Sequence, residues 1–243
     1  MLELSLSENI IITVLSFFTA LMTSIAGAGG GTVLLAAMLQ FMNPAEAIPV
    51  HGAIQLTSNL TRAWLLRKFV NWEIIFKFSL LLPFGIFLGL KIFQNIDSDN
   101  IKILIGIFIL LALGLQNLRI INNIKISTNI YILIGFFTGV LNILVGVIAP
   151  LLAVIVKQSI SEKKSIVGTL GYFGLIGNLI KIIGFSFIGF SFFEYIDTFL
   201  MVVPATLIGS RIGQFLLNKI SNRIFTIMFQ IILIGLAIRL LLT

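Results

Sequence analysis

The sequence contains no cysteine and a single histidine, His51, among its 243 residues. Without cysteine the chain forms no disulfides and no thiolate metal sites, and one histidine does not make a histidine-rich metal cluster. Haem, zinc and thiol redox chemistry are therefore disfavoured together, and we expect no cofactor.

Charged residues are also scarce. They make up 10% of the chain, whereas hydrophobic residues make up 58% and the mean hydropathy is +1.14. A water-soluble domain of this length cannot cover so much apolar surface. The composition predicts an integral membrane protein surrounded by the lipid bilayer. The net charge of +7 comes from basic residues in the links between apolar segments, which indicates topology signals and no nucleic-acid partner.

Apolar segments of membrane-spanning length follow one another along almost the whole chain. They cover residues 9–42, 46–66, 73–94, 101–118, 129–157, 165–187, 194–217 and 223–242. Strands of a membrane barrel would be about half as long and alternating. No linker or low-complexity tract interrupts the series, so we expect one all-α membrane domain over residues 1–243.

One sequence pattern occurs twice, 119 residues apart. SFFTALMTSIAGAGGG at 16–31 aligns with GFFTGVLNILVGVIAP at 135–150, and SNLTR at 58–62 aligns with GNLIK at 177–181. Repeated, interrupted hydrophobic segments are typical of secondary transporters, which bind their solute between the repeats. We therefore expect two repeats of about four hydrophobic segments each, at about 9–120 and about 128–243.

The first apolar segment of each repeat is too long for one straight crossing. A 34-residue helix would extend ~51 Å at 1.5 Å per residue, against a hydrocarbon core of ~30 Å. Glycines at 27, 29, 30 and 31 interrupt the first segment, and Gly146 and Pro150 interrupt the second. Glycine permits the backbone angles of a sharp reversal. We expect each repeat to open with a broken or re-entrant helical hairpin, whose second helix restarts at Thr32 or Leu151.

Basic residues favour hairpins over kinked single crossings, because cytoplasmic links carry the excess of lysine and arginine. If both long segments return to the side from which they enter, all the following residues lie on the cytoplasmic side: Arg67, Lys68, Arg119, Lys125, Lys157, Lys163, Lys164, Arg211, Lys219 and Arg223. This arrangement has six full crossings, two hairpins, both termini outside and two repeats of inverted orientation.

The chain resembles the TauE/SafE family of membrane permeases over nearly its whole length. The residues that carry the resemblance are residues 27–31, Gln55, Thr57, Ser58, Asn59, Arg62, Gly139, Asn142, Gly146 and Pro150. Many relatives have two glycines before the second-repeat proline, where this chain has Ile148 and Ala149. The resemblance implies transport of a small, frequently sulfur-containing anion, such as sulfite or an organosulfonate, across the bacterial cytoplasmic membrane.

Interrupted helices provide a binding site for an anion at the point where the second helix begins. The free N–H groups and the positive dipole end there bind negative charge without a charged side chain. The polar residues of 55–62 recur at helical spacing and form a stripe on an apolar segment. The candidate substrate-binding residues are Gly27, Gly29, Gly30, Gly31, Thr32, Gln55, Ser58, Asn59, Arg62, Asn142, Gly146, Pro150, Asn178 and Lys181.

Several alternatives stay open. Arg62 and Lys181 contact the substrate or extend toward the membrane surface, and Asn59 and Asn178 contact the substrate or join helices. His51 is expected near the outer surface, in a capping or interface role in preference to the alternative of a proton relay. An anion channel is a competing function, and an intramembrane serine hydrolase that pairs His51 with Ser24 or Ser58 is a weaker one. The sequence also leaves a homodimer open.

Overall fold

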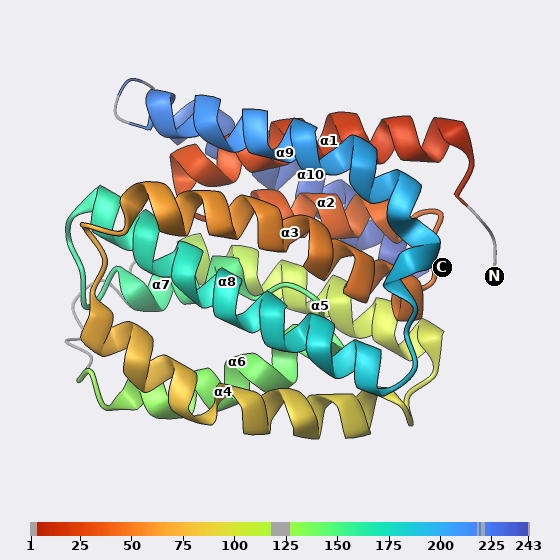
Figure 1. The fold of residues 1–243 in the computed structure, drawn as a ribbon, viewed down its shortest axis with the longest axis horizontal. Helices are drawn as coiled ribbons and strands as arrows, with labels where there is room; N and C mark the ends of the chain where they lie inside the picture. The colour runs from red at the N-terminus through yellow and green to blue at the C-terminus, as the bar shows by residue number, and fades with distance from the viewer. Residues whose placement is uncertain (1–3, 118–126, 218, 220–221, 243) are drawn as a thin grey trace.

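The computed structural model describes residues 4–117, 127–217, 219 and 222–242. Over these residues the chain forms α-helices, one short 3-10 helix and no strand (Figure 1). The elements are α1 (Leu6–Ala26), α2 (Gly30–Met38), α3 (Pro44–Leu66), α4 (Trp72–Phe93), α5 (Ser98–Asn117), α6 (Ile130–Leu144), α7 (Ala149–Val156), α8 (Lys163–Phe187), η2 (Phe192–Tyr195), α9 (Ile196–Leu216) and α10 (Asn222–Leu242).

The all-α prediction is confirmed, and six of the eight apolar segments correspond to one helix each, with bounds that agree to within three residues. Among the described residues, five helical stretches are long and apolar enough to cross a membrane: Leu6–Ala26, Trp72–Phe93, Ser98–Leu115, Lys163–Phe187 and Phe192–Leu216. α3 is long enough as well, but it carries the polar stripe of Gln55, Asn59 and Arg62. The protein is therefore a helical membrane protein.

Both overlong segments are broken, as predicted. α1 ends at Gly27, which has a φ of 86°, and Gly29 before α2 has a φ of 104°. Gly146 between α6 and α7 has a φ of 72°. These angles lie in the left-handed region that favours glycine. The second helices begin at Gly30 and Ala149, two residues earlier than expected, because the first turn of each helix includes the small or proline residues at the break.

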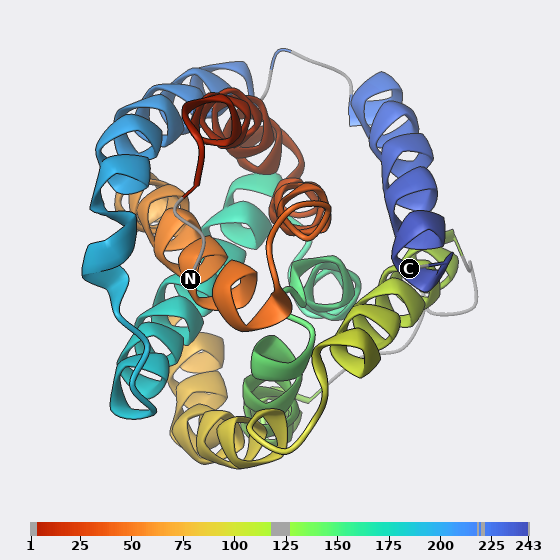
Figure 2. The same cartoon turned by 90° about the vertical axis from the view of Figure 1, so that its right-hand side faces the viewer.

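The first break reverses the chain. Gly30 at the start of α2 lies against Thr19 and Thr23 of α1, so α2 runs back beside α1 (Figure 1). Seen end-on, both short helices occupy the middle of the bundle and the longer helices surround them (Figure 2). Almost all of the α2 side chains are buried. The two breaks therefore lie deep inside the protein.

The main helix pairs join the two halves of the chain. α1 packs along α9, α4 along α6 and α3 along α8. α3 and α8 run in opposite directions: Gly52 lies against Lys181, whereas Leu66, at the other end of α3, lies against Gly168 (Figure 1). Phe78 of α4 stacks on Phe173 of α8, with ring centroids 3.8 Å apart. Neither half has its own separate interior.

Glycines set the close approach of these helices. A Cβ atom at Gly85 or Gly135 would meet a backbone carbonyl of the facing helix in the α4–α6 pair, and Gly209 and Gly213 play the same part against α1. Small residues at a helix interface allow the backbone contacts that hold membrane helices together. Gly85, Gly89 and Gly106 thus pack against neighbouring helices.

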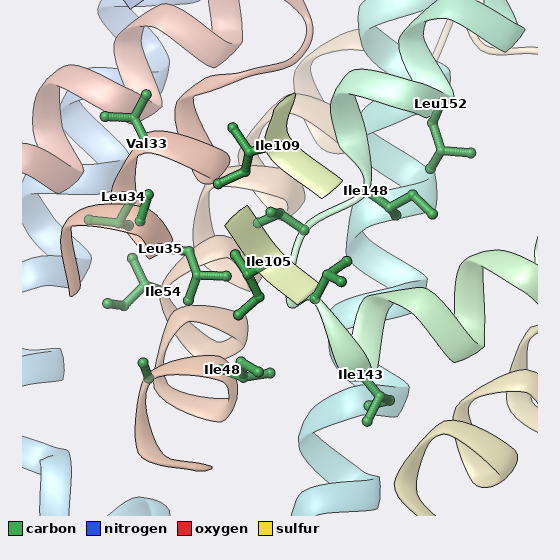
Figure 3. Packing of buried hydrophobic residues seen from close by; sticks show 14 of the residues in the cluster. Val33, Leu34, Leu35, Ile48, Ile54, Ile105, Ile109, Ile143, Ile148 and Leu152 are labelled. Carbon is green, nitrogen blue, oxygen red and sulfur yellow. The ribbon is translucent and has the colours of Figure 1, made fainter. Parts of the chain in front are cut away.

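An apolar core fills the space between the two short helices. Leu35 of α2 points toward Ile105 of α5, and Ile148, just before α7, points toward Leu152 (Figure 3). These residues belong to one apolar cluster that joins α2, α5 and α7, and Ile148 and Leu152 also line the polar cavity described next. Two of the basic link residues, Arg119 and Lys125, lie outside the described residues.

Candidate functional site

One cavity of about 60 Å³ lies where the two helix breaks meet. From the first half of the chain it is lined by Thr23, Gly27, Gly31, Thr32, His51, Gln55, Asn59 and Arg62. From the second half it is lined by Thr138, Asn142, residues 146–149, Leu152, Leu170, Phe173, Gly174, Gly177 and Asn178. A water molecule needs ~10–15 Å³ by this measure, so the cavity has room for a few waters or one small oxyanion.

Arg62 reaches the cavity from α3 and binds the end of α1. Its side chain is 3% exposed. Nη1 donates to the carbonyl oxygens of Thr23 at 3.5 Å and Gly27 at 3.3 Å, and Nη2 donates to Asn59 Oδ1. The last carbonyls of a helix have no partner within the helix and form its negative end. Arg62 therefore caps α1, and it does not extend to the membrane surface.

Lys181 makes the corresponding contacts in the second half of the chain. It is completely buried, and its Nζ donates to the carbonyl oxygens of Asn142 at 3.5 Å and Gly146 at 3.0 Å and to Asn142 Oδ1 at 3.1 Å. Lys181 follows Arg62 by 119 residues. The same interval separates Gly27 from Gly146, the break glycines whose carbonyl oxygens these two side chains bind. The alternative that Lys181 extends to the surface is wrong, because its ammonium group is held at the second break.

Arg62 and Lys181 have no buried acidic partner among the residues that the structure describes. Every aspartate and glutamate in the described part of the chain is exposed or partly exposed. The carbonyl groups at the breaks offset part of the charge, but each is a partial charge only. α2 and α7 both begin without a side-chain cap. The positive ends of these two helices therefore add to the positive potential of the cavity. The cavity thus has an excess of positive potential.

Three residues that line the cavity have a buried polar atom without a hydrogen-bond partner among the described residues. The atoms are Thr32 Oγ1, His51 Nδ1 and Arg62 Nε. Leaving such an atom unpaired costs ~1–3 kcal/mol. Their grouping on α2 and α3 indicates that a polar ligand or water completes the site on this side of the cavity.

The sequence predicted a position near the outer surface for His51, but the structure buries this residue. It is 2% exposed and lines the cavity, and its Nε2 lies 2.8 Å from the carbonyl oxygen of Gly31. The estimate from sequence failed because α2 turns back and covers the beginning of α3. The ring bonds to neither Ser24 nor Ser58, and Ser58 Oγ instead lies 3.1 Å from Ser210 Oγ of α9. No histidine–serine pair of the kind a hydrolase needs is formed by these residues.

Nine of the fourteen candidate residues line the cavity: Gly27, Gly31, Thr32, Gln55, Asn59, Arg62, Asn142, Gly146 and Asn178. The other five do not. Gly29 and Pro150 belong to the breaks but are not part of the cavity lining, and Gly30 is covered by α1. Ser58 bonds to α9, and Lys181 lies behind Asn142.

Sequence reasoning missed part of the lining. Gly174 and Gly177 of α8 face the cavity, and a Cβ atom at Gly174 would collide with the Asn59 amide. Their signal was the spacing of three between Gly171, Gly174 and Gly177, which puts all three near one helix face. Phe173 was missed because a lone aromatic residue in an apolar helix carries no distinguishing pattern.

The fold and the site define a class: a polytopic α-helical membrane protein with a small, electropositive cavity at two helix breaks. The model of the family described as sulfite exporter TauE/SafE matches residues 12–240, and the chain belongs to that family. No curated protein and no solved structure matched significantly. The family consists of membrane transporters, and this membership fits a permease and not an enzyme.

Proposed function

We propose that the protein is a secondary transporter that carries a small anion across the cytoplasmic membrane by alternating access. Sulfur oxyanions such as sulfite, and small organosulfonates, are the first candidates. The single observation that carries the proposal is the charge of the site: Arg62 and Lys181 are buried, and no buried carboxylate accompanies them in the described residues. A bound anion supplies the missing negative charge.

The cost of this uncompensated charge supports an anionic ligand. A buried ion without a partner loses several kcal/mol of hydration, and charges in a membrane interior usually mark a transport pathway. The break carbonyls hold each cation in place, yet they do not neutralise it. An anion in the cavity is therefore attracted strongly although Lys181 does not line the cavity itself.

The polar groups of the cavity suit an oxyanion. Thr32, Gln55, Asn59, Asn142 and Asn178 are uncharged side chains that can donate hydrogen bonds, and they come from both halves of the chain. The space of about 60 Å³ matches a compact ion such as sulfite, whereas a longer organosulfonate needs the site to open. The ligand's charge and size are thus set by different parts of the cavity.

We further propose that residues of about 9–120 and about 128–243 are inverted repeats within one membrane domain. Three observations support this: the 119-residue correspondence of Arg62 with Lys181, the matching bonds of both to a break, and the opposite directions of α3 and α8. Inverted repeats give a carrier two related arrangements, open to opposite sides of the membrane. The site at the breaks then stays in place while access changes.

Binding and transport test the proposal separately. The purified protein in detergent is heated with sulfite, sulfate, thiosulfate or methanesulfonate, and at least one of these anions should raise the melting temperature in a saturable manner. Proteoliposomes preloaded with that anion should then show counterflow of labelled anion. A channel would instead give large currents without counterflow. Absence of stabilisation by every anion, with intact helical CD, would contradict an anion site.

A matched pair of variants locates the site. Asn59→Leu removes a cavity donor and should weaken the anion-dependent stabilisation at least tenfold. Lys157→Met removes an exposed cation at the end of α7 and should leave the stabilisation unchanged. Equal losses in both variants would indicate a surface effect of charge and would argue against the cavity.

A further inference from the structure

His51 is a titratable group in the lining of the anion cavity, and the proposed function assigns no role to it. It lies on α3 one helical turn before Gln55, and both side chains line the cavity. Its position 119 residues further on is Leu170, which also lines the cavity. Histidine is the side chain whose charge changes most readily near neutral pH. The cavity therefore has a titratable imidazole from the first half of the chain, whereas the second half contributes the apolar side chain of Leu170 at the equivalent position.

The hydrogen bond to Gly31 decides which ring nitrogen carries the proton. A carbonyl oxygen only accepts hydrogen bonds. Nε2 lies 2.8 Å from the carbonyl oxygen of Gly31 and is therefore the donor. In the neutral ring Nδ1 is then an acceptor with a free lone pair. Nδ1 is buried and has no partner among the described residues. The ring is therefore poised to take a second proton at Nδ1, and only there.

The charges around His51 oppose that proton when the cavity is empty. α8 brings Lys181, whose Cε lies next to Gly52 on α3, and α3 itself carries Arg62 at the same cavity. α2 has no titratable side chain. The acids and bases of α5 and α9 (Asp99, Lys102, Asp197 and Arg211) and Glu46 of α3 sit at exposed or partly exposed positions. A third positive charge is thus costly without an anion.

An anion reverses this balance. It cancels positive charge beside the imidazole, and its oxygen accepts a hydrogen bond, whereas the unprotonated Nδ1 has none to give. A protonated Nδ1 donates a hydrogen bond to the anion. The anion and the proton therefore favour each other's binding, which is thermodynamic coupling between two ligands of one site.

We propose that His51 couples proton movement to anion transport, in addition to the proposed function on which this inference rests. A proton from water on the open side forms the Nδ1–H bond as the anion enters, and it returns to water on the other side when the anion leaves. One proton thus accompanies each anion in the same direction. Leu170 offers no second acceptor, so the ratio is one to one.

The single histidine makes the test direct. The full chain, labelled with [15N]histidine and purified with a tag that contains no histidine, shows one imidazole by NMR. Thiosulfate and methanesulfonate serve as probes, because neither anion titrates near neutral pH. Without anion the spectrum should show a neutral ring protonated at Nε2, and with saturating anion both nitrogens should be protonated.

A variant connects this signal to transport. His51→Gln keeps a donor for Gly31 but does not titrate. Its affinity for the probe should be lower than that of the wild type and independent of pH, and at saturating probe an imposed pH gradient should no longer drive accumulation. Lys157→Gln, at an exposed position, should keep the pH-dependent affinity and the accumulation. Binding of a probe by the wild type with an unchanged imidazole spectrum would overturn the coupling, as would pH-driven accumulation by His51→Gln. Failure of the wild type to bind any anion would instead count against the proposed function.

Discussion

Lys181 crosses α3 at Gly52, where its Cε lies 2.9 Å from the position that a Cβ atom of residue 52 would occupy. The corresponding contact in the other half of the chain joins Arg62 and Gly171, at 3.2 Å between that position and Arg62 Cβ. Each buried cation therefore passes over a glycine of the opposite helix on its way to a break. The glycines at 52 and 171, like the cations, are 119 residues apart.

Gly52→Ala should displace Lys181 from Asn142 and Gly146. Overpacking of this kind typically costs ~1–3 kcal/mol, so we expect the free energy of unfolding in mixed micelles to fall despite the better helix propensity of alanine. Gly114→Ala is the control, since nothing lies within 4 Å of a Cβ atom at that exposed position of α5. It should gain up to ~1 kcal/mol. Equal effects in both variants would show that Lys181 moves aside freely.

Neutralising either buried cation should weaken anion binding more than it weakens the fold. Arg62→Met and Lys181→Met each remove one positive charge whose desolvation is costly, so their own stability should change little in either direction. The anion concentration needed for half-maximal stabilisation should rise at least tenfold, with Lys157→Met unchanged. Thermal unfolding at a series of anion concentrations measures both effects. Unaltered affinity in the two variants would remove the charge argument for the site.

Gly30→Ala should destabilise the first hairpin. A Cβ atom there would collide with the Thr19 carbonyl oxygen and with Thr23 Oγ1 of α1, and the backbone cannot yield as a flexible side chain does. We expect a loss of ~1–3 kcal/mol of unfolding free energy and a lower yield of folded protein. Limited proteolysis and unfolding titrations report this. A fully stable variant would mean that α2 is able to move away from α1.

Ser58→Ala should leave transport intact. Its hydroxyl bonds to Ser210 between α3 and α9, and the loss of one such bond costs ~0.5–1.5 kcal/mol. Proteoliposome flux at saturating anion should match the wild type, while the melting temperature falls slightly. Complete loss of function in a folded variant would reopen a nucleophilic role for this serine.

The absence of cysteine allows topology to be tested with single substitutions. Ser5→Cys, before α1, should react with a membrane-impermeant thiol reagent added from outside the cell, because both termini are expected there. Glu162→Cys, at the exposed start of α8, should react only after the cytoplasmic side is made accessible. Labelling of both from the same side would exclude the two hairpins as we propose them.

The helices were predictable from the sequence because their signal is the length of uninterrupted apolar runs. The breaks were predictable too, since Gly27 and Gly146 interrupt segments longer than the bilayer is thick. The repeat indicated that Arg62 and Lys181 correspond to each other. These features depend on the lengths of apolar runs and on internal sequence similarity, both of which a single sequence displays directly.

The burial of His51 and the role of Gly174 were not predictable in the same way. Both depend on which helix lies opposite: α2 covers His51 by turning back, and Asn59 of α3 occupies the space beside Gly174. Apolar periodicity does not specify partners inside a membrane protein, because lipid and neighbouring helices are equally apolar. The polar lining of a cavity follows from those partners.

The pairing of α1 with α9 sets the order in which the protein is completed during synthesis. Gly209 meets the backbone of Phe17, 192 residues earlier in the chain, whereas Gly85 meets that of Phe136, only 51 residues later. α1 thus waits in the bilayer while the 192 residues from Phe17 to Gly209 are translated. Synthesis that stops before Gly209 would leave α1 without the helix it packs against, and the unfinished product would be a substrate for membrane proteases.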